Sequence, residues 1–197
     1  MPKGIPRTKE ELEDRRKEIA HAAADLIFDK GFTETSVIQI AKAAGMGKSS
    51  LYDYFPNKDE IILYLLDGPL TELNQRAEVI ISGAGNVVER LRKVMKMHLD
   101  ILLRNTAFIL KVTLAAQRLN AESQQRYQIK RYAYQDRLQA LIEEGIAQGS
   151  IRPINAAIAM KTLLAIMTPV VFTTRPVGSP EEMLDDALDI FLKGIQA

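Results

Sequence analysis

Residues 36–55 read SVIQIAKAAGMGKSSLYDYF, and Pro56 follows them. Apolar side chains in the first half have the spacing of a short helix that ends at Ala44. Gly45 suits the left-handed position just beyond a helix end, which a residue with a Cβ resists. Gly47 can cap a second helix that runs to residue 55, where the proline ends it. Two short helices joined by a tight turn have the spacing of a helix-turn-helix.

The second helix of this motif has an apolar side and a polar side. Leu51, Tyr54 and Phe55 share the side that can pack on the first helix. The opposite side carries Lys48, Ser49, Tyr52 and Asp53. A lysine and hydroxyl groups there suit phosphate, and the positive N-terminal end of the helix helps. A merely solvated face is the plainer interpretation, but the turn glycines, short helices and exposed tyrosine together favour DNA binding.

Helix starts recur along the whole chain as a small polar residue with Glu or Gln three positions later. Such pairs satisfy backbone N–H groups that the first turn of a helix leaves unpaired. The pairs are Thr8 with Glu11, Ser36 with Gln39, Asn57 with Glu60, Asn86 with Glu89, and Ser179 with Glu182. No stretch shows sustained apolar–polar alternation, so we predict an all-α fold of about nine helices and no sheet. Its parts would be an N-terminal three-helix domain and a C-terminal helical bundle.

Composition excludes several classes of site in this 197-residue chain. There is no cysteine, and the two histidines, His21 and His98, are far apart, so we expect no metal and no cofactor. No apolar run reaches the roughly 18 residues of a membrane span, and the N-terminus lacks an apolar signal core. We therefore expect a cytoplasmic protein without a membrane partner. No nucleophile–base pair or phosphate-cradling glycine loop is present, so no catalytic residue and no enzyme activity are expected.

The net charge of +1 does not by itself indicate nucleic acid, so a case for DNA rests on local charge. Residues 1–9 carry Lys3, Arg7 and Lys9 without an acid, and Arg15 and Arg16 follow. These residues are either a solvated tail or a flexible arm that adds phosphate or minor-groove contacts.

The motif resembles the DNA-binding signature of the TetR family of transcription regulators over roughly residues 15–65. The resemblance rests on GFTETSV at 31–37, IAKAAG at 40–45, the helix at 48–55 and KDE at 58–60. It implies phosphate contacts from the start of the first motif helix, from the second helix and from the start of the next helix. It also implies that two serines lie closest to the base edges. The implied DNA-binding residues are Thr35, Ser36, Lys48, Ser49, Ser50, Tyr52, Tyr54 and Lys58.

Two positions depart from the family pattern. Gly47 stands where serine is common, and Asp53 stands where many members carry histidine or another neutral or basic residue. Asp53 either offsets the charge of a nearby cation or accepts a hydrogen bond from a cytosine amino group.

The resemblance divides the chain into a DNA-binding domain, residues 1–60, and a ligand-binding and dimerisation domain, residues 61–197. Gly68-Pro69 would be a hinge within the fourth helix or simply a helix end. The last helices look like the family's contribution to a four-helix dimer interface, with an internal core as the alternative. The predicted interface residues are Met160, Leu163, Leu164, Met167, Val171, Leu184, Leu188 and Phe191.

The candidate ligand-pocket residues include His98, which lies at helical spacing from Leu91, Met95 and Leu102 and hence on an apolar face. It is either a satisfied core residue or a polar group inside a mostly apolar pocket. The candidate pocket residues are Met95, His98, Leu102, Thr106, Phe108, Thr113, Gln117, Tyr127 and Tyr134.

These features predict a homodimeric repressor that binds a palindromic operator in double-stranded DNA. Two recognition helices about 34 Å apart would read two half-sites. A small apolar or aromatic effector would release them or, with the opposite sign, favour DNA binding. The alternative is a nucleoid-associated, division-inhibiting or chromosome-organising protein of the same family with a packed body and no ligand.

Overall fold

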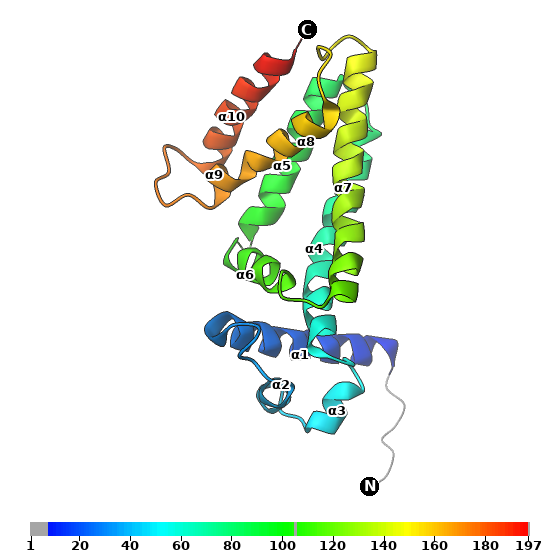
Figure 1. Cartoon of the computed structure of the whole chain (residues 1–197), viewed down its shortest axis with the longest axis vertical. Helices are drawn as coiled ribbons and strands as arrows, with labels where there is room; N and C mark the ends of the chain where they lie inside the picture. The colour runs from blue at the N-terminus through cyan, green and yellow to red at the C-terminus, as the bar shows by residue number, and fades with distance from the viewer. Residues whose placement is uncertain (1–7, 105, 197) are drawn as a thin grey trace. The chain divides into compact units, whose positions relative to one another are not determined.

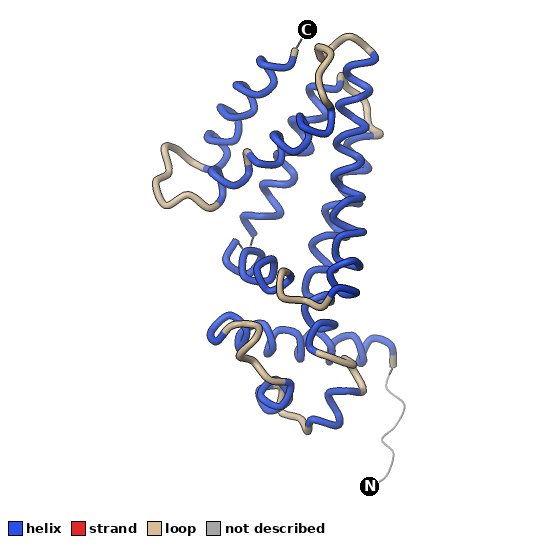
Figure 2. The backbone as a smooth tube through the Cα atoms, viewed as in Figure 1, coloured by secondary structure: helices blue, strands red, loops and turns tan. Residues whose placement is uncertain are grey.

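A computed structural model describes residues 8–104 and 106–196. Those residues form ten helices and no strand, which confirms the all-α prediction (Figure 2). The expected count was about nine because α8 and α9, separated only by Ile166, read as one helix in the sequence. The helices are α1 (Lys9–Lys30), α2 (Val37–Ala43), α3 (Lys48–Tyr52), α4 (Lys58–Ile81), α5 (Val87–Arg104), α6 (Thr106–Ala116), α7 (Ala121–Ala147), α8 (Ala156–Ala165), α9 (Met167–Val171) and α10 (Pro180–Ile195).

All five predicted helix starts are confirmed. Thr8, Ser36 and Ser179 form reciprocal capping boxes with Glu11, Gln39 and Glu182. The side-chain oxygens of Asn57 and Asn86 each accept a hydrogen bond from the backbone three residues later, at 2.9 Å. These bonds span a single helical turn, so the sequence alone predicts them.

The described residues divide into two compact units. The first holds residues 8–68 and 108–127, and the second holds residues 69–104, 106–107 and 128–196. These bounds differ from a division at residue 60, because α6 and the start of α7 cluster with the N-terminal helices. The functional division into a DNA-binding and an effector domain stays a prediction.

Helix α4 contributes to both units and passes through Pro69 without ending. The alternative that Gly68-Pro69 ends a helix is therefore wrong. A proline removes one backbone hydrogen bond, but packing on both sides can hold the helix together. Leu65, Leu66 and Leu73 flank the proline and are buried.

The core of the first unit includes side chains of α1, α2, α3, the turn after α3 and the start of α4. Helix α1 packs on α2, and α2 packs on α3 (Figure 1). Ile19, Ile40, Leu51 and Phe55 are completely buried there. This packing holds the polar side of the short helix α3 away from the core.

The core of the second unit contains the apolar faces of several long helices. Helix α10 packs on α5 and on α9 (Figure 1). Leu91, Met95, Leu138, Leu163 and Leu188 are completely buried in this core. No helix in the described ranges is long and apolar enough to cross a membrane.

Candidate nucleic-acid interface and ligand pocket

The turn between α2 and α3 has the geometry that its glycines predict. Gly45 has φ +66°, the left-handed conformation that favours glycine, and Met46 N donates to Ala41 O at 2.9 Å. Gly47 is the N-cap of α3 and offers no side-chain hydrogen bond. The structure therefore confirms two short helices joined by a tight turn.

Helix α3 ends at Tyr52, three residues before the predicted end. The backbone N–H groups of Tyr54 and Phe55 both donate to the carbonyl of Leu51, each at 3.0 Å. These bonds close a turn in place of further helix, so the prediction of a helix to residue 55 was wrong. The predicted burial of Leu51 and Phe55 is confirmed.

Most of the predicted DNA-binding side chains gather on the surface of this motif. The exposed ones are Ser36, Lys48, Ser49, Ser50 and Tyr52, whereas Tyr54 is half-buried. The ammonium of Lys48 lies 6.0 Å from the centroid of the Tyr52 ring. Asp53 is exposed at the C-cap of α3, and both interpretations of its role stay predictions.

The side chains of Thr35 and Lys58, two of the predicted phosphate-binding residues, point into the protein instead. Thr35 is only 1% exposed, and its hydroxyl donates to Gly31 O at 2.7 Å. The Lys58 ammonium donates to the carbonyls of Phe32 and Thr35. The expected side-chain contact of Thr35 with DNA does not fit this geometry, because its hydroxyl is enclosed and already bonded.

Cations of α1 also have internal partners, which the sequence did not indicate. Arg15 Nη2 donates to the carbonyl of Ala44 at 2.8 Å, at the end of α2. The Arg16 guanidinium lies 4.9 Å from the centroid of the Phe55 ring and 5.0 Å from that of Tyr64. Lys3 and Arg7 of the predicted arm lie outside the described residues.

Tyr64 links α4 to the same side of α1. Its hydroxyl donates to Glu13 Oε1 at 2.6 Å. Burial, followed by this hydrogen bond to a carboxylate, raises the pKa of Tyr64 to about 12. The phenol therefore stays protonated and serves as a donor that fastens α4 to α1.

The predicted ligand-pocket residues are divided between the two units. Met95, His98, Leu102, Thr106 and Tyr134 belong to the second unit, whereas the remaining four belong to the first, namely Phe108, Thr113, Gln117 and Tyr127. The Thr106 hydroxyl donates to Leu102 O at 3.1 Å. The Phe108 ring packs edge-on against the Phe28 ring, with centroids 5.6 Å apart.

Half-buried His98 of α5 and buried Tyr134 of α7 form a polar pair. The Tyr134 hydroxyl lies 3.2 Å from His98 Nδ1, and the rings meet edge to face with centroids 5.3 Å apart. Burial lowers the pKa of His98 to about 4, so the imidazole is neutral at physiological pH. A hydrogen-bonded neutral pair fits the interpretation of His98 as a satisfied core residue.

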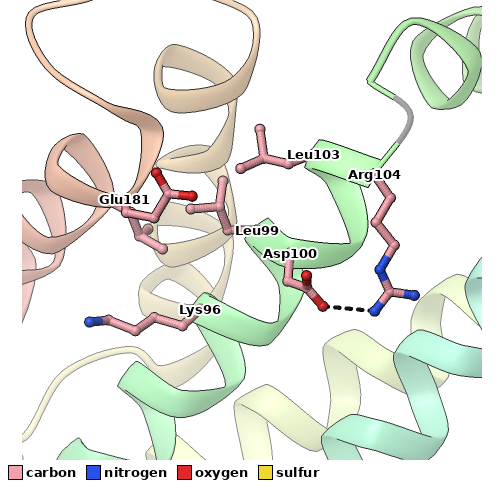
Figure 3. A pocket seen from close by; sticks show the side chains of 7 residues that line it. Lys96, Leu99, Asp100, Leu103, Arg104 and Glu181 are labelled. Atoms are coloured by element: carbon pink, nitrogen blue, oxygen red, sulfur yellow. Dashed lines mark hydrogen bonds and ion pairs between the residues drawn. The ribbon is translucent and has the colours of Figure 1, made fainter.

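A pocket of about 420 Å³ lies in the second unit, between α5 and the first turns of α10 (Figure 3). Apolar side chains and charged side chains line it together: Lys96, Leu99, Asp100, Leu103, Arg104, Glu181 and Leu184. Of these, only Leu184 was singled out in the sequence, as an interface residue.

Three of the charged side chains of this pocket, those of Lys96, Asp100 and Arg104, are held by ion pairs. Asp100 pairs with Arg104 at 2.7 Å, as Figure 3 shows, and Lys96 pairs with Asp185 at 2.8 Å. Leu99 and Leu103 lie four and eight residues beyond Met95 on α5. That spacing continues the apolar face of α5 and is the signal that could have identified the pocket.

Most of the predicted interface residues are buried within the chain itself. Met160, Leu163, Met167, Leu184 and Leu188 are at most 4% exposed, so their side chains belong to its own core. Leu164, Val171 and Phe191 are half-buried. The internal-core alternative therefore describes the five buried residues. Of the eight predicted interface residues, only Leu164, Val171 and Phe191 have surface that a partner could cover.

Other apolar side chains of the same helices are the exposed ones. Ile158 of α8 is 58% exposed, and Ile190 of α10 is 78% exposed. Val177, in the loop before α10, is 90% exposed. For Ile158 and Ile190, the sequence signal was a second apolar stripe on each helix. A helix that is apolar on most sides needs more than one neighbour.

Comparisons with known proteins agree with this architecture. Residues 19–65 match the family described as "Bacterial regulatory proteins, tetR family". Residues 84–195 match "Tetracyclin repressor-like, C-terminal domain". The second match alone spans more than half of the chain.

Individual relatives are regulators. The chain is 27% identical to the fatty acid metabolism regulator protein of Bacillus subtilis, over 68% of this chain and 70% of that protein. It is 29% identical to the HTH-type transcriptional repressor KstR2 of Mycobacterium tuberculosis, over 76% and 75% of the two chains.

A solved structure, the transcriptional regulator FadR from Bacillus subtilis in complex with stearoyl-CoA, has a TM-score of 0.75. The match covers 91% of this chain and 99% of that chain at 23% identity, and it supports the fold alone. The helix-turn-helix geometry and the two family matches together lead to one conclusion. The chain belongs to the TetR family of DNA-binding transcription regulators.

Proposed function

We propose that this regulator is a homodimeric repressor that leaves a palindromic operator when it binds an amphipathic acyl effector, a fatty acyl-CoA. The pocket in the second unit carries the proposal. Leu99 and Leu103 line it with apolar side chains, and its rim carries both cationic and anionic groups, so a head group would lie beside Lys96 and Arg104 (Figure 3). A mostly apolar site with a few charged groups is usual for small-molecule ligands.

The relatives support the choice of an acyl effector. One relative is named for fatty acid metabolism, and a protein of the same fold binds stearoyl-CoA. An acyl-CoA combines an apolar chain with several phosphate charges. The chain would lie against the leucines, and the phosphates would compete with Asp185 and Asp100 for Lys96 and Arg104. The effector would act by binding the DNA-free conformation more tightly than the operator-bound one.

On the DNA side, we assign direct contacts to the exposed residues of the motif. Lys48, Tyr52 and Tyr54 would hold phosphates, and Ser49 and Ser50 would lie nearest the base edges. Ser36 would contribute at the start of α2. Contacts of this kind position the protein, whereas base-edge contacts carry the sequence preference.

Selection of bound genomic fragments by the purified protein tests the DNA side of the proposal. We expect a palindromic site beside a small number of genes, including those for acyl-chain metabolism. Enrichment of many dispersed sites would support the nucleoid-associated alternative instead. The salt concentration has to be stated, because phosphate contacts make affinity strongly salt-dependent.

The effector is tested with a panel of probes on the selected fragment: long-chain and short-chain acyl-CoA, CoA alone and free fatty acid. Long-chain acyl-CoA should release the DNA, and CoA alone should not. Leu103→Trp should weaken release by filling the pocket, while the matched control Val79→Trp, on an exposed residue of α4, should not. Release by CoA alone, or equal release from the Leu103 variant, would contradict the assignment of the pocket.

The dimer is tested at the exposed apolar residues of α8 and α10. Ile190→Glu should convert the dimer into a monomer, since it places a charge in an interface that would otherwise be apolar. Val79→Glu, at a similarly exposed residue of α4, is the control and should leave the dimer intact. Sedimentation equilibrium distinguishes the two states, and a dimer of the Ile190 variant would contradict this interface.

A further inference from the structure

We propose that Lys58 is a positioning residue, which fastens the turn between α1 and α2 to the start of α4, and that it does not contact DNA phosphate. The inference depends on the DNA binding of the family. It separates Lys58 from Lys48, although the sequence suggests the same role for both. The difference lies in what each ammonium group meets in the folded chain.

The Lys58 ammonium is surrounded by partners within the protein. Nζ donates to the carbonyl of Phe32, and also to that of Thr35 at 2.8 Å. It lies 4.1 Å from the centroid of the Phe32 ring, within the range of a cation–π contact. An ammonium has three N–H donors, so two carbonyls and one ring face account for most of its capacity.

Burial points the same way. Lys58 is half-buried, and desolvation lowers its pKa, although Asp59 and Glu34 act in the opposite direction. A phosphate contact would require the ammonium to turn away from both carbonyls. Since Thr35 is 1% exposed, its carbonyl would then lose its donor in an enclosed place, which is unfavourable.

The turn that Lys58 holds leads directly into α2. Thr35 closes the same turn from within, because its hydroxyl donates to Gly31 O at 2.7 Å. The next residue, Ser36, is the N-cap of α2, and its N–H donates to Gln39 Oε1 at 2.8 Å. Lys58 therefore sets where α2 begins, and α2 carries the turn that presents α3.

Lys48 provides the matched comparison. It is exposed on α3, and its ammonium lies 6.0 Å from the Tyr52 ring centroid. Its charge is therefore accessible to a phosphate, whereas the charge of Lys58 is directed at carbonyl oxygens.

The first experiment compares the salt dependence of DNA binding for wild type, Lys58→Met and Lys48→Met. The probe is a mixed-sequence duplex of about 30 base pairs at low salt, so the test does not require a known operator. Loss of a phosphate contact lowers the slope of log affinity against log salt by about 0.9 per contact. We expect that decrease for Lys48→Met, with no change in melting temperature.

For Lys58→Met we expect weaker binding with the slope of wild type, and a melting temperature lower by a few degrees. A slope that decreases as it does for Lys48→Met would overturn the proposal. An unchanged melting temperature together with unchanged affinity would overturn it as well. Failure of both lysine variants to alter DNA binding would instead place the DNA-binding surface elsewhere.

A second experiment uses only the wild-type protein and so does not depend on the variants folding. Lysines are acetylated with acetic anhydride, with and without the duplex, and the rate at each lysine is followed by mass spectrometry. Lys48 should react readily in the free protein and become protected by DNA. Lys58 should react at the same rate with and without the duplex, because its amine faces carbonyls of its own chain. Protection of Lys58 by the duplex to the same degree as Lys48 would overturn the proposal.

Discussion

Two cations of the N-terminal helices are held differently from two cations of the second unit. In α1 and α4, Arg16 and Lys58 lie against aromatic rings and backbone carbonyls. In the second unit, Arg76 and Arg104 each pair with both Glu72 and Asp100, as a closed network of four charges. Neutral partners hold a cation in place without cancelling its charge, whereas carboxylates cancel it.

This difference has a consequence for binding. Residues 36–58 contain three lysines and one acid, Asp53, so this segment keeps a net positive charge. The paired charges of the second unit add little to the field beyond their own contacts. A chain with a net charge of only +1 can therefore still present a locally positive surface.

The largest expected effect is at the ring that lies under Arg16. Phe55 is completely buried and packs edge to face against Tyr64, with centroids 5.5 Å apart. Phe55→Ala should lower the free energy of unfolding by about 3–5 kcal/mol, through a cavity and the lost ring contacts. Urea unfolding measures it, and Phe55→Leu is the control that retains most of the volume. A loss below about 1 kcal/mol for the alanine variant would contradict this packing.

The next effect concerns the neutral pair of His98 and Tyr134 in the second unit. The pKa of His98 is about 4 in the folded chain, below its ordinary value of about 6.5 in an unfolded one. The unfolded state therefore binds more protons between these values, and stability is lost as pH falls from about 6.5 towards 4. The slope is at most about 1.4 kcal/mol per pH unit.

Urea unfolding at several pH values measures this slope. The His98→Gln variant, which has no titrating ring, should lose that part of the pH dependence, while other groups continue to titrate. An unchanged slope in the variant would show that His98 is not the group responsible.

A smaller effect distinguishes Arg16, which lies against aromatic rings, from the arginines of the second unit that form ion pairs. Arg16→Met should lower the free energy of unfolding by about 1 kcal/mol, the magnitude of a partly desolvated cation–π contact. Because its partners are neutral rings, we expect this loss to be nearly equal at low and high salt. A loss that vanished at high salt would indicate a carboxylate partner instead.

The smallest effect is expected at the exposed network of the second unit. Arg104→Gln should shift the urea midpoint slightly at low salt and leave it unchanged at high salt, because exposed ion pairs are weak and screened. The same pair of salt conditions used for Arg16→Met makes the comparison direct. A destabilisation by Arg104→Gln that is equal at low and high salt would contradict the assignment of Arg104 to exposed ion pairs.

The candidate site shows how far local sequence patterns reach. The exposed residues Lys48, Ser49 and Tyr52 follow from the length of α3 and from burial of Leu51 on its other side. The inward direction of Lys58 does not follow from sequence, since its partners are carbonyls 23 and 26 residues away. A backbone carbonyl has no side-chain signature, so no residue type reveals such a partner.

The second unit shows the same limit for apolar residues. Helical spacing identifies Leu184, Leu188 and Ile190 as apolar positions of α10, but not which of them faces the core. The structure buries the first two completely and leaves Ile190 78% exposed. A helix with more than one apolar stripe requires a neighbour to decide between them.

By itself the sequence determined the all-α fold, the five helix starts and the glycine turn of the helix-turn-helix, because each depends on bonds within one or two turns of the chain. Only the tertiary structure decided that Thr35 and Lys58 point inward, that Arg16 lies against rings, and which residues line the pocket. Those contacts join residues far apart in sequence, and a side chain's direction is set by whichever distant partner folding places beside it.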